Sequence, residues 1–234
     1  MARLKMIGLD ADDTLWQNEQ FFKLTHRRFA ELLADYAPAD HLEERLLAAE
    51  SRNLGHYGFG IKGFTLSMIE TAIEVTEDRV PARIIREIIA AGQEMLRHPI
   101  ELLPGVEAAV DALAERHPLV LITKGDLLDQ ERKLAQSGLG ERFAGVEIVS
   151  HKTPGVYAGI FARHGAAEGE SLMAGNSLKS DVIPVIAAGG HGVHVPHELT
   201  WAWEQSDAPA PHPRFHVLPD LQALIALVAE IEGD

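Results

Sequence analysis

The stretch LKMIGLDADDTL, residues 4–15, decides the fold of this chain. Its first half, residues 4–9, is a short apolar run that is typical of a buried strand. Asp10 follows this run directly, and Asp12 and Thr14 come shortly after it. Ligands of open α/β sheets bind beyond the carboxyl ends of the strands. The stretch therefore predicts a buried strand with a candidate site at its carboxyl end.

Apolar runs alternate with helical patterns in the rest of the chain. This alternation predicts a mostly parallel sheet with helices on both faces, so the expected fold class is α/β. Further strands are expected near residues 119–123, 146–150, 171–174, 192–195 and 214–217. Helices are expected near residues 105–116, 127–137, 154–164, 178–188 and 221–231.

A helical insertion separates the first strand from the second. About 110 residues lie between them, far more than one crossover helix needs. Helical patterns occur at residues 22–36, 40–51, 64–75 and 82–96. We therefore expect an α/β core of residues 1–16 and 101–234 with an inserted α-helical cap at residues 17–100. Clefts between such domains are favoured ligand sites.

The sequence LGHYGFGIKG, residues 54–63, is interpreted as a loop because it contains four glycines. Its aromatic and basic side chains indicate more than a plain spacer. His56, Tyr57 and Lys62 are therefore candidates for recognising the leaving group of a substrate. An ordinary connection between two helices is the open alternative.

Polar side chains follow each of the first four predicted strands. Because the carboxyl ends of parallel strands meet at one edge of a sheet, we expect these side chains to converge. The candidates are Asp10 and Asp12 after the first strand, Thr123 and Lys124 at the end of the second, Lys152 after the third, and Asn176 and Asp181 after the fourth. One site would then hold carboxylates, ammonium groups, a hydroxyl and an amide.

These residue types suit phosphoryl transfer. A carboxylate can attack phosphorus, so Asp10 is the expected nucleophile. Asp12 would protonate the leaving group and then deprotonate water. Thr123 and Lys152 would bind the phosphoryl oxygens, and Mg²⁺ held by oxygen ligands would neutralise the transferring group.

Each candidate has an ordinary explanation when it is taken alone. Asp10 could be a turn residue, Lys152 a surface lysine and Asn176 a helix cap. Asp13 is expected to be structural or solvated. The functional interpretation depends on the four segments occurring in order at strand ends.

The ordered segments resemble the motifs of the haloacid dehalogenase (HAD) superfamily, in its aspartate-nucleophile phosphatase branch. The matching motifs are Asp10-x-Asp12-x-Thr14, Thr123, Lys152 and Gly175-Asn176-x4-Asp181. The resemblance covers nearly the whole chain, including a helical cap between the first and second motifs. It implies a Rossmann-like core, a Mg²⁺ cofactor and hydrolysis of a small phosphorylated metabolite through an aspartyl-phosphate intermediate.

The resemblance also assigns roles to the residues that bind phosphate and react with it. It makes Asp10 the nucleophile and Asp12 the general acid and base, and Asp12 also lends its main-chain carbonyl to the metal. Phosphate binding falls to Thr123 and Lys152. Lys124 is a further phosphate-binding candidate, because the main-chain N–H groups after Thr123 can donate to the phosphoryl oxygens. The same intermediate also serves a phosphotransferase or phosphomutase, which stays open as an alternative.

The metal ligands that the resemblance implies are Asp10, Asp12, Asn176 and Asp181. Asn176 departs from the family, which usually has an acidic residue at this position. Its amide oxygen can still bind a metal, with one negative charge fewer, so weaker metal binding is expected. This departure also leaves a non-catalytic binding protein as a further alternative. The true dehalogenases of the superfamily lack the second aspartate, so Asp12 indicates phosphoryl chemistry.

Other histidines and aromatic residues are weaker candidates. His191 and His194 would point to opposite faces of a strand and are poor partner ligands. With His197, they are expected to be structural or surface residues. Trp201 and Trp203 could line a cleft, but packing is the simpler expectation.

The composition narrows the class of protein. Asp and Glu number 35 against 21 Lys and Arg, which gives a net charge of −14 and disfavours nucleic-acid and membrane partners. Cysteine is absent from the sequence, which excludes disulfides and thiolate metal sites. Neither a signal peptide nor a membrane span is apparent, so a cytoplasmic protein is expected. An oligomeric state is not indicated.

Overall fold

The computed structural model describes residues 3–199 and 201–233. These residues form two compact units. One unit, the core, holds the chain up to Glu19, the segment Ile100–Lys124 and the chain from Gln130 onward. The other, the helical unit, holds Gln20–Pro99 and the short segment Gly125–Asp129.

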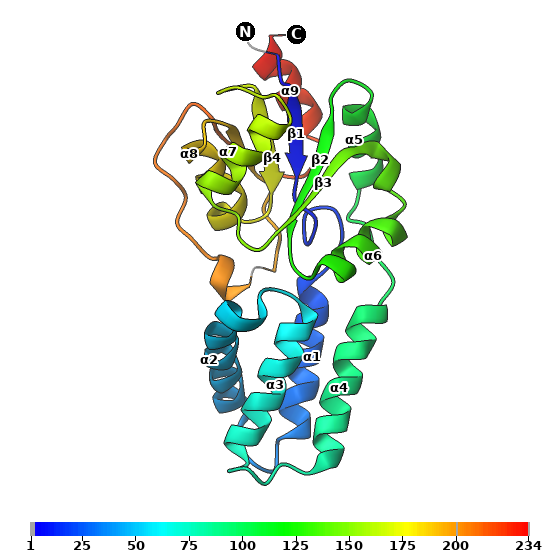
Figure 1. Ribbon diagram of the computed structural model, residues 1–234, viewed down its shortest axis with the longest axis vertical. Helices are drawn as coiled ribbons and strands as arrows, with labels where there is room; N and C mark the ends of the chain where they lie inside the picture. Colours follow the sequence, from blue (N-terminus) through cyan, green and yellow to red (C-terminus); the bar gives the residue numbers. More distant parts are fainter. Residues whose placement is uncertain (1–2, 200, 234) are drawn as a thin grey trace. The chain divides into compact units, whose positions relative to one another are not determined.

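A parallel sheet lies at the centre of the core (Figure 1). Within the described residues it has six strands in the order β3-β2-β1-β4-β5-β6. They are β1 (Met6–Leu9), β2 (Leu119–Lys124), β3 (Phe143–Val149), β4 (Ser171–Gly175), β5 (His191–His194) and β6 (Phe215–Val217). All neighbouring strands are parallel, which confirms the predicted α/β class. The switch in strand order places β1 between β2 and β4, where such sheets bind ligands.

Helices cover both faces of this sheet. They are α5 (Val106–Ala114), α6 (Leu127–Ser137), α7 (Pro154–Arg163), α8 (Ile183–Ala187) and α9 (Leu224–Glu232). On one face, Ile7 and Leu9 of β1 belong to a buried cluster with residues of α5, α6 and α9. On the other face, Met6 clusters with residues of α7 and α8. The alternation along β1 follows from the two-residue period of a strand.

Gly8 of β1 is closely packed against the neighbouring strands. A Cβ at this position would lie 2.8 Å from both Ile122 Cδ1 and Met173 Sδ. Real Cβ atoms essentially never approach other atoms so closely. A larger residue here would therefore displace the side chains of both neighbouring strands.

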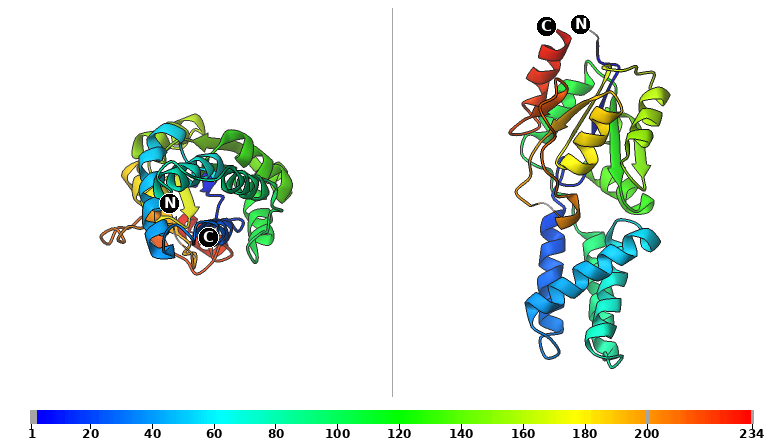
Figure 2. Two further views of the ribbon diagram at one scale, coloured as in Figure 1. Left: turned by 90° about the horizontal axis from the view of Figure 1, so that it is seen from below. Right: turned by 90° about the vertical axis from the view of Figure 1, so that its left-hand side faces the viewer.

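The helical unit contains α1 (Glu19–Leu32), α2 (Ala39–Tyr57), α3 (Ile61–Val75) and α4 (Ala82–Arg97). Figures 1 and 2 show these helices packed into a bundle. Its buried cluster includes Phe29, Leu46, Phe64 and Ile88. In the part of the chain that the structure describes, no helix has both the length and the apolar character needed to cross a bilayer.

The predicted loop at residues 54–63 is wrong in extent. Helices α2 and α3 continue into it and leave Gly58, Phe59 and Gly60 as the connection. The φ angles of Gly58 and Gly60 are 72° and 118°, a region that favours glycine. Gly63 instead lies inside α3, where a Cβ would be 3.0 Å from the main-chain oxygen of Gly58. Gly63 lets the backbone of α3 approach the main chain of Gly58 closely. The surrounding sequence does not distinguish a glycine of this kind from a glycine in a loop.

The predicted helix at residues 178–188 is also not continuous. Its first part, η2 (Leu178–Val182), is a π-helical turn, and α8 follows it. Pro184 has no N–H group to donate and therefore suits the first turn of a new helix. Widened turns of this kind are often found at functional sites.

Candidate active site

Asp10, Lys152 and Asp181 meet beyond the carboxyl end of the sheet. Lys152 Nζ lies 2.5 Å from Asp10 Oδ1 and 2.6 Å from Asp181 Oδ1. The Lys152 side chain is only 1% exposed, and Asp181 is equally buried. The main-chain N–H of Asp10 also donates to Ala174 O, at 2.9 Å, which fixes the residue beside β4. The structure therefore brings these three predicted site residues together.

The charges of this cluster are not balanced. Burial and then the neighbouring Asp181 raise the pKa of Asp10 to about 7, despite the opposing effect of Lys152. Burial by itself would lower the pKa of Lys152, but Asp10 and Asp181 raise it well above the usual value. Lys152 is thus a permanent cation that two buried carboxylates share. The site has an excess of negative charge that a bound cation would relieve.

Thr14 joins the first motif to the fourth. Its hydroxyl donates to Asp10 Oδ2, at 3.1 Å, and lies 3.4 Å from Asn176 Oδ1. The same hydroxyl accepts a hydrogen bond from the main-chain N–H of Asn176, at 3.1 Å. The side-chain oxygens of Asp10 and Asn176 therefore lie on either side of one hydroxyl.

The fourth motif is folded tightly around Asp181. The main-chain N–H of Ser177 donates to Asp181 Oδ2 at 3.0 Å. A Cβ at Gly175 would lie 2.3 Å from the same oxygen, so glycine is required before Asn176. Ser177 Oγ accepts from the main-chain N–H of Ser180 at 3.0 Å and caps the turn η2.

Asp12 faces a different set of partners. Trp16 Nε1 donates to its carboxylate at 2.7 Å, Gln130 Nε2 at 2.9 Å and Lys133 Nζ at 2.9 Å. Burial raises the pKa of Asp12, but Lys133 and these hydrogen bonds lower it more, so the net direction is down. Asp12 is therefore ionised at neutral pH and oriented by α6.

Asp13 has a structural role, in agreement with one of the two roles predicted for it. It is buried, and its carboxylate accepts from the main-chain N–H groups of Asn18 at 2.9 Å and Glu19 at 3.0 Å. These bonds cap the start of α1. Burial and Asp12 raise the pKa of Asp13 to about 6. His197 Nδ1 lies 3.8 Å from the same carboxylate.

Thr123 and Lys124 end strand β2 beside the cluster. Thr123 is buried, and its hydroxyl donates to the main-chain oxygen of Lys124 at 3.3 Å. Lys124 Nζ forms a very short contact with Glu204 and donates to Ser180 Oγ at 2.8 Å. Phosphate binding by Thr123 and Lys124 stays a prediction.

His56, Tyr57 and Lys62 all lie in the helical unit. Lys62 Nζ is 2.9 Å from both carboxylate oxygens of Asp126. Tyr57 Oη donates to Glu70 Oε1 at 3.2 Å, and its ring is 6.4 Å from that of His56. Their role in substrate specificity stays a prediction.

The clustered histidines make separate contacts. His191 Nδ1 is 3.2 Å from His216 Nε2, and burial together with His216 lowers the pKa of His191 to about 4. His194 Nε2 donates to the main-chain oxygen of Asn176 at 3.1 Å. These contacts fit the structural roles that the sequence predicted for them.

The described residues contain no ready-made metal centre of side chains. Among residues 3–199 and 201–233, no group of three or more His, Cys, Asp or Glu side chains is arranged to hold a metal ion. Asn176 Oδ1 and the main-chain carbonyls are further hard oxygen donors, of the kind that Mg²⁺ takes in addition to carboxylates. The metal ligands predicted from the sequence stay a prediction.

Several residues of the site are not among those predicted from the sequence. Gln130 and Lys133 are three residues apart on α6, so they share one helix face, and this spacing was a usable signal. Trp16 is an apolar-looking residue whose ring N–H reaches Asp12. Glu204 comes from an irregular segment near the C-terminus, and no periodic pattern marks it.

Known proteins share this architecture. A haloacid dehalogenase-like hydrolase from Xanthomonas campestris is 41% identical, with a TM-score of 0.88 over 98% of this chain and 92% of that one. An L-2-haloacid dehalogenase from Xanthobacter autotrophicus, solved with chloropropionic acid covalently bound, is 17% identical, with a TM-score of 0.65 over 96% and 98%. A predicted phosphoglycolate phosphatase from Haemophilus somnus is 17% identical, with a TM-score of 0.64 over 97% and 99%. The last two show the fold alone.

Sequence comparison assigns the family. No curated protein matches the chain. The family model for haloacid dehalogenase-like hydrolases matches residues 4–189, which include the Asp10, Lys152 and Asp181 cluster. Together with the relative from Xanthomonas campestris, this match is decisive: the chain belongs to the haloacid dehalogenase-like hydrolases.

Proposed function

We propose that this hydrolase is a magnesium-dependent phosphatase of a small phosphorylated metabolite. The observation that carries the proposal is a second carboxylate, Asp12, half-buried and held in its ionised form two residues after Asp10. The fold does not distinguish a phosphatase from a dehalogenase, because a dehalogenase and a predicted phosphatase are both among its structural neighbours.

A second carboxylate is useful for phosphate esters and dispensable for haloacids. A halide leaves as a stable anion and needs no proton. An alkoxide leaving from a phosphate ester is a strong base and needs an acid beside it. Asp12 can supply this proton and can later take one from water. Its presence therefore supports phosphoryl chemistry over dehalogenation.

In the proposed reaction, a carboxylate oxygen of Asp10 attacks phosphorus and the bond to the leaving oxygen breaks. Asp12, which takes up a proton when the anionic phosphate binds beside it, gives that proton to the leaving oxygen. Water then attacks the phosphorus of the aspartyl phosphate, Asp12 takes the proton, and Asp10 leaves as a carboxylate. An anionic phosphate beside Asp12 raises the pKa of that carboxyl group, which offsets the lowering effect of Lys133.

The donor set fits Mg²⁺. Thr14 brings side-chain oxygens of Asp10 and Asn176 to one hydroxyl, and burial followed by the charge of Asp181 raises the pKa of Asp10. Asp10, Asn176, Asp181 and the main-chain carbonyl of Asp12 would hold the ion. When bound, it would neutralise charge on the phosphoryl group.

The role of Asp12 is tested by changing the leaving group. Asp12→Asn should slow hydrolysis of an alkyl phosphate by about a hundredfold or more, because the alkoxide loses its acid. With p-nitrophenyl phosphate, whose leaving group is a weak base, the loss should be about tenfold or less. Initial rates with both esters measure the difference. Equal losses on the two esters would contradict the assignment.

The metal site is tested at Asn176. Asn176→Asp adds a carboxylate, and part of its attraction for Mg²⁺ is cancelled by desolvation, so affinity should rise about tenfold. The Mg²⁺ concentration for half-maximal rate should fall accordingly. Ser206→Asp adds the same charge at an exposed position and should leave the titration unchanged. An Asn176→Asp titration that overlays the wild-type curve would remove Asn176 from the metal site.

A further inference from the structure

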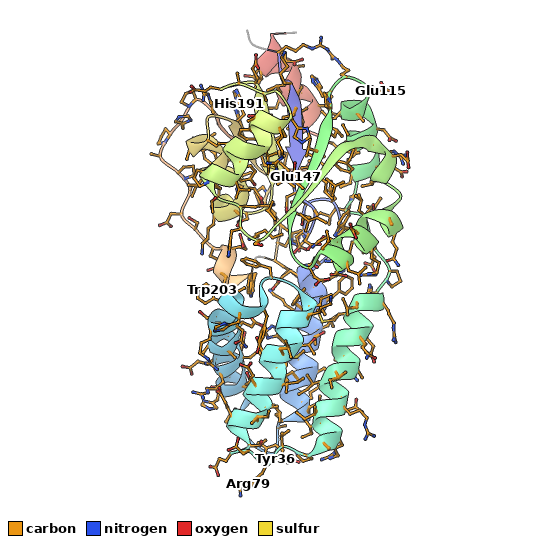
Figure 3. All side chains as sticks on the ribbon, viewed as in Figure 1. Tyr36, Arg79, Glu115, Glu147, His191 and Trp203 are labelled. Carbon is orange, nitrogen blue, oxygen red and sulfur yellow. The ribbon has the colours of Figure 1, made fainter. Side chains whose placement is uncertain are left out.

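The short turn η3 (Ala202–Glu204) is fastened to the fourth motif within the core. Lys179 Nζ donates to the main-chain oxygen of Trp203 at 2.7 Å and lies 5.9 Å from the centre of its ring. Trp203 is labelled on this turn in Figure 3. The contacts fix the turn beside η2, so the next residue, Glu204, has a defined position.

Glu204 collects donors from two separate motifs. Lys124 at the end of β2 and Ser177 before η2 both make very short contacts with its carboxylate. Ser180 Oγ donates to Glu204 Oε2 at 2.5 Å. The carboxylate thus connects the second motif to the fourth.

The pair of Glu204 and Lys124 is largely shielded from solvent. Their side chains are 16% and 14% exposed. Burial raises the pKa of Glu204, but Lys124 and the serine hydroxyls outweigh it and lower the pKa to about 2. At neutral pH Glu204 therefore carries a full negative charge, which faces the ammonium group of Lys124.

A short series of contacts connects this pair to the candidate nucleophile. Lys124 donates to Ser180, whose neighbour Asp181 accepts from Lys152. Lys152 also donates to Asp10. An uncompensated charge on either Lys124 or Glu204 would therefore act on an anion bound beside Asp10.

We propose that Glu204 is a positioning residue that holds Lys124 against the fourth motif and balances its charge beside the phosphate site. The inference rests on the proposed phosphatase function. As a consequence, the product phosphate binds beside a pair, Lys124 and Glu204, whose charges cancel. Product is then bound by Lys152 and the hydrogen-bond donors, without an additional cation to retard its release.

A charge cycle on the two residues tests this role, with the dissociation constant of inorganic phosphate measured by calorimetry in the presence of Mg²⁺. Glu204→Gln keeps the shape and removes the negative charge of the pair, so phosphate should bind about three- to tenfold more tightly. Lys124→Met leaves Glu204 unbalanced, so phosphate should bind about three- to tenfold more weakly. The double variant should return to within about twofold of wild type.

Glu198→Gln is the matched control, because it removes the same charge from an exposed position between β5 and η3. It should leave phosphate affinity unchanged. If Glu204→Gln does not fold, comparing the phosphate affinity of Lys124→Met with that of the double variant still measures the effect of the Glu204 charge. The double variant should regain the affinity that Lys124→Met loses.

The outcomes separate this inference from the proposed function. Opposite shifts in the single variants, cancelled in the double, support a charge-balancing Glu204. Three results would overturn the role of Glu204 without contradicting the phosphatase function. They are weaker phosphate binding in both single variants, unchanged binding in both, or a double variant that binds phosphate as weakly as Lys124→Met. A wild-type protein that neither binds phosphate nor hydrolyses a phosphate ester contradicts the proposed function, and this inference with it.

Discussion

Asp10→Asn should abolish turnover, by at least about a thousandfold, because the amide cannot form the covalent intermediate. Initial rates with p-nitrophenyl phosphate measure the loss. The result is informative only if the variant is folded, so the thermal midpoint must be measured beside the rate. A folded Asp10→Asn protein with a near-native rate would contradict the assignment.

The same variant should not lose stability. The pKa of Asp10 is about 7 in the folded chain against an ordinary value of 3.8. An aspartate with a raised pKa binds its proton more tightly when folded, so its ionisation costs stability as the pH rises from 3.8 to 7. The uncharged amide of the Asp10→Asn variant would carry no such cost. At pH 8, the thermal midpoint of this variant should therefore equal or exceed that of wild type.

Lys152→Met should have the largest effect on stability. It leaves the carboxylates of Asp10 and Asp181 buried without the cation that both contact. Removing one partner of a buried ion pair typically costs about 3–5 kcal/mol. Urea denaturation at pH 8 should show a loss of this size in the free energy of unfolding. The variant should also be inactive, because the proposed phosphate ligand is gone.

A double variant separates the charge effect from lost packing. Lys152→Met/Asp181→Asn contains one buried carboxylate fewer and should regain part of the lost stability. If loss of packing alone were responsible, the second change would regain nothing. A Lys152→Met protein within about 1 kcal/mol of wild type would show that the ion cluster contributes little.

The sequence contained enough information to bring Asp10, Lys152 and Asp181 together. Each follows a predicted strand, and the carboxyl ends of parallel strands share one edge of the sheet. The positions of Asp10 and Lys152 follow from strand pairing, and that of Asp181 depends in addition on the π-helical turn η2. The protonation state of Asp10 does not follow from strand pairing, since its raised pKa depends on burial and on Asp181.

Residues that act from irregular segments escaped prediction. Glu204 reaches Lys124 across a separation of 80 positions, and no periodicity relates the two. Gly63 shows the converse error, because a glycine inside α3 was interpreted as part of a loop. In the first case the deciding factor is a tertiary contact, and in the second it is the close approach of Gly63 to the main-chain oxygen of Gly58; local composition encodes neither.

The most direct test of the central claim is to trap the intermediate on Asp10. Wild-type protein is mixed with p-nitrophenyl phosphate and Mg²⁺, quenched in acid during turnover and digested, and the mass of the peptide containing Asp10 is measured by mass spectrometry. The account predicts the added mass of one phosphoryl group on Asp10 and none in Asp10→Asn. Turnover of the ester with an unmodified Asp10 peptide, or an Asp10 ester formed from a 2-haloacid but none from the phosphate ester, would contradict it.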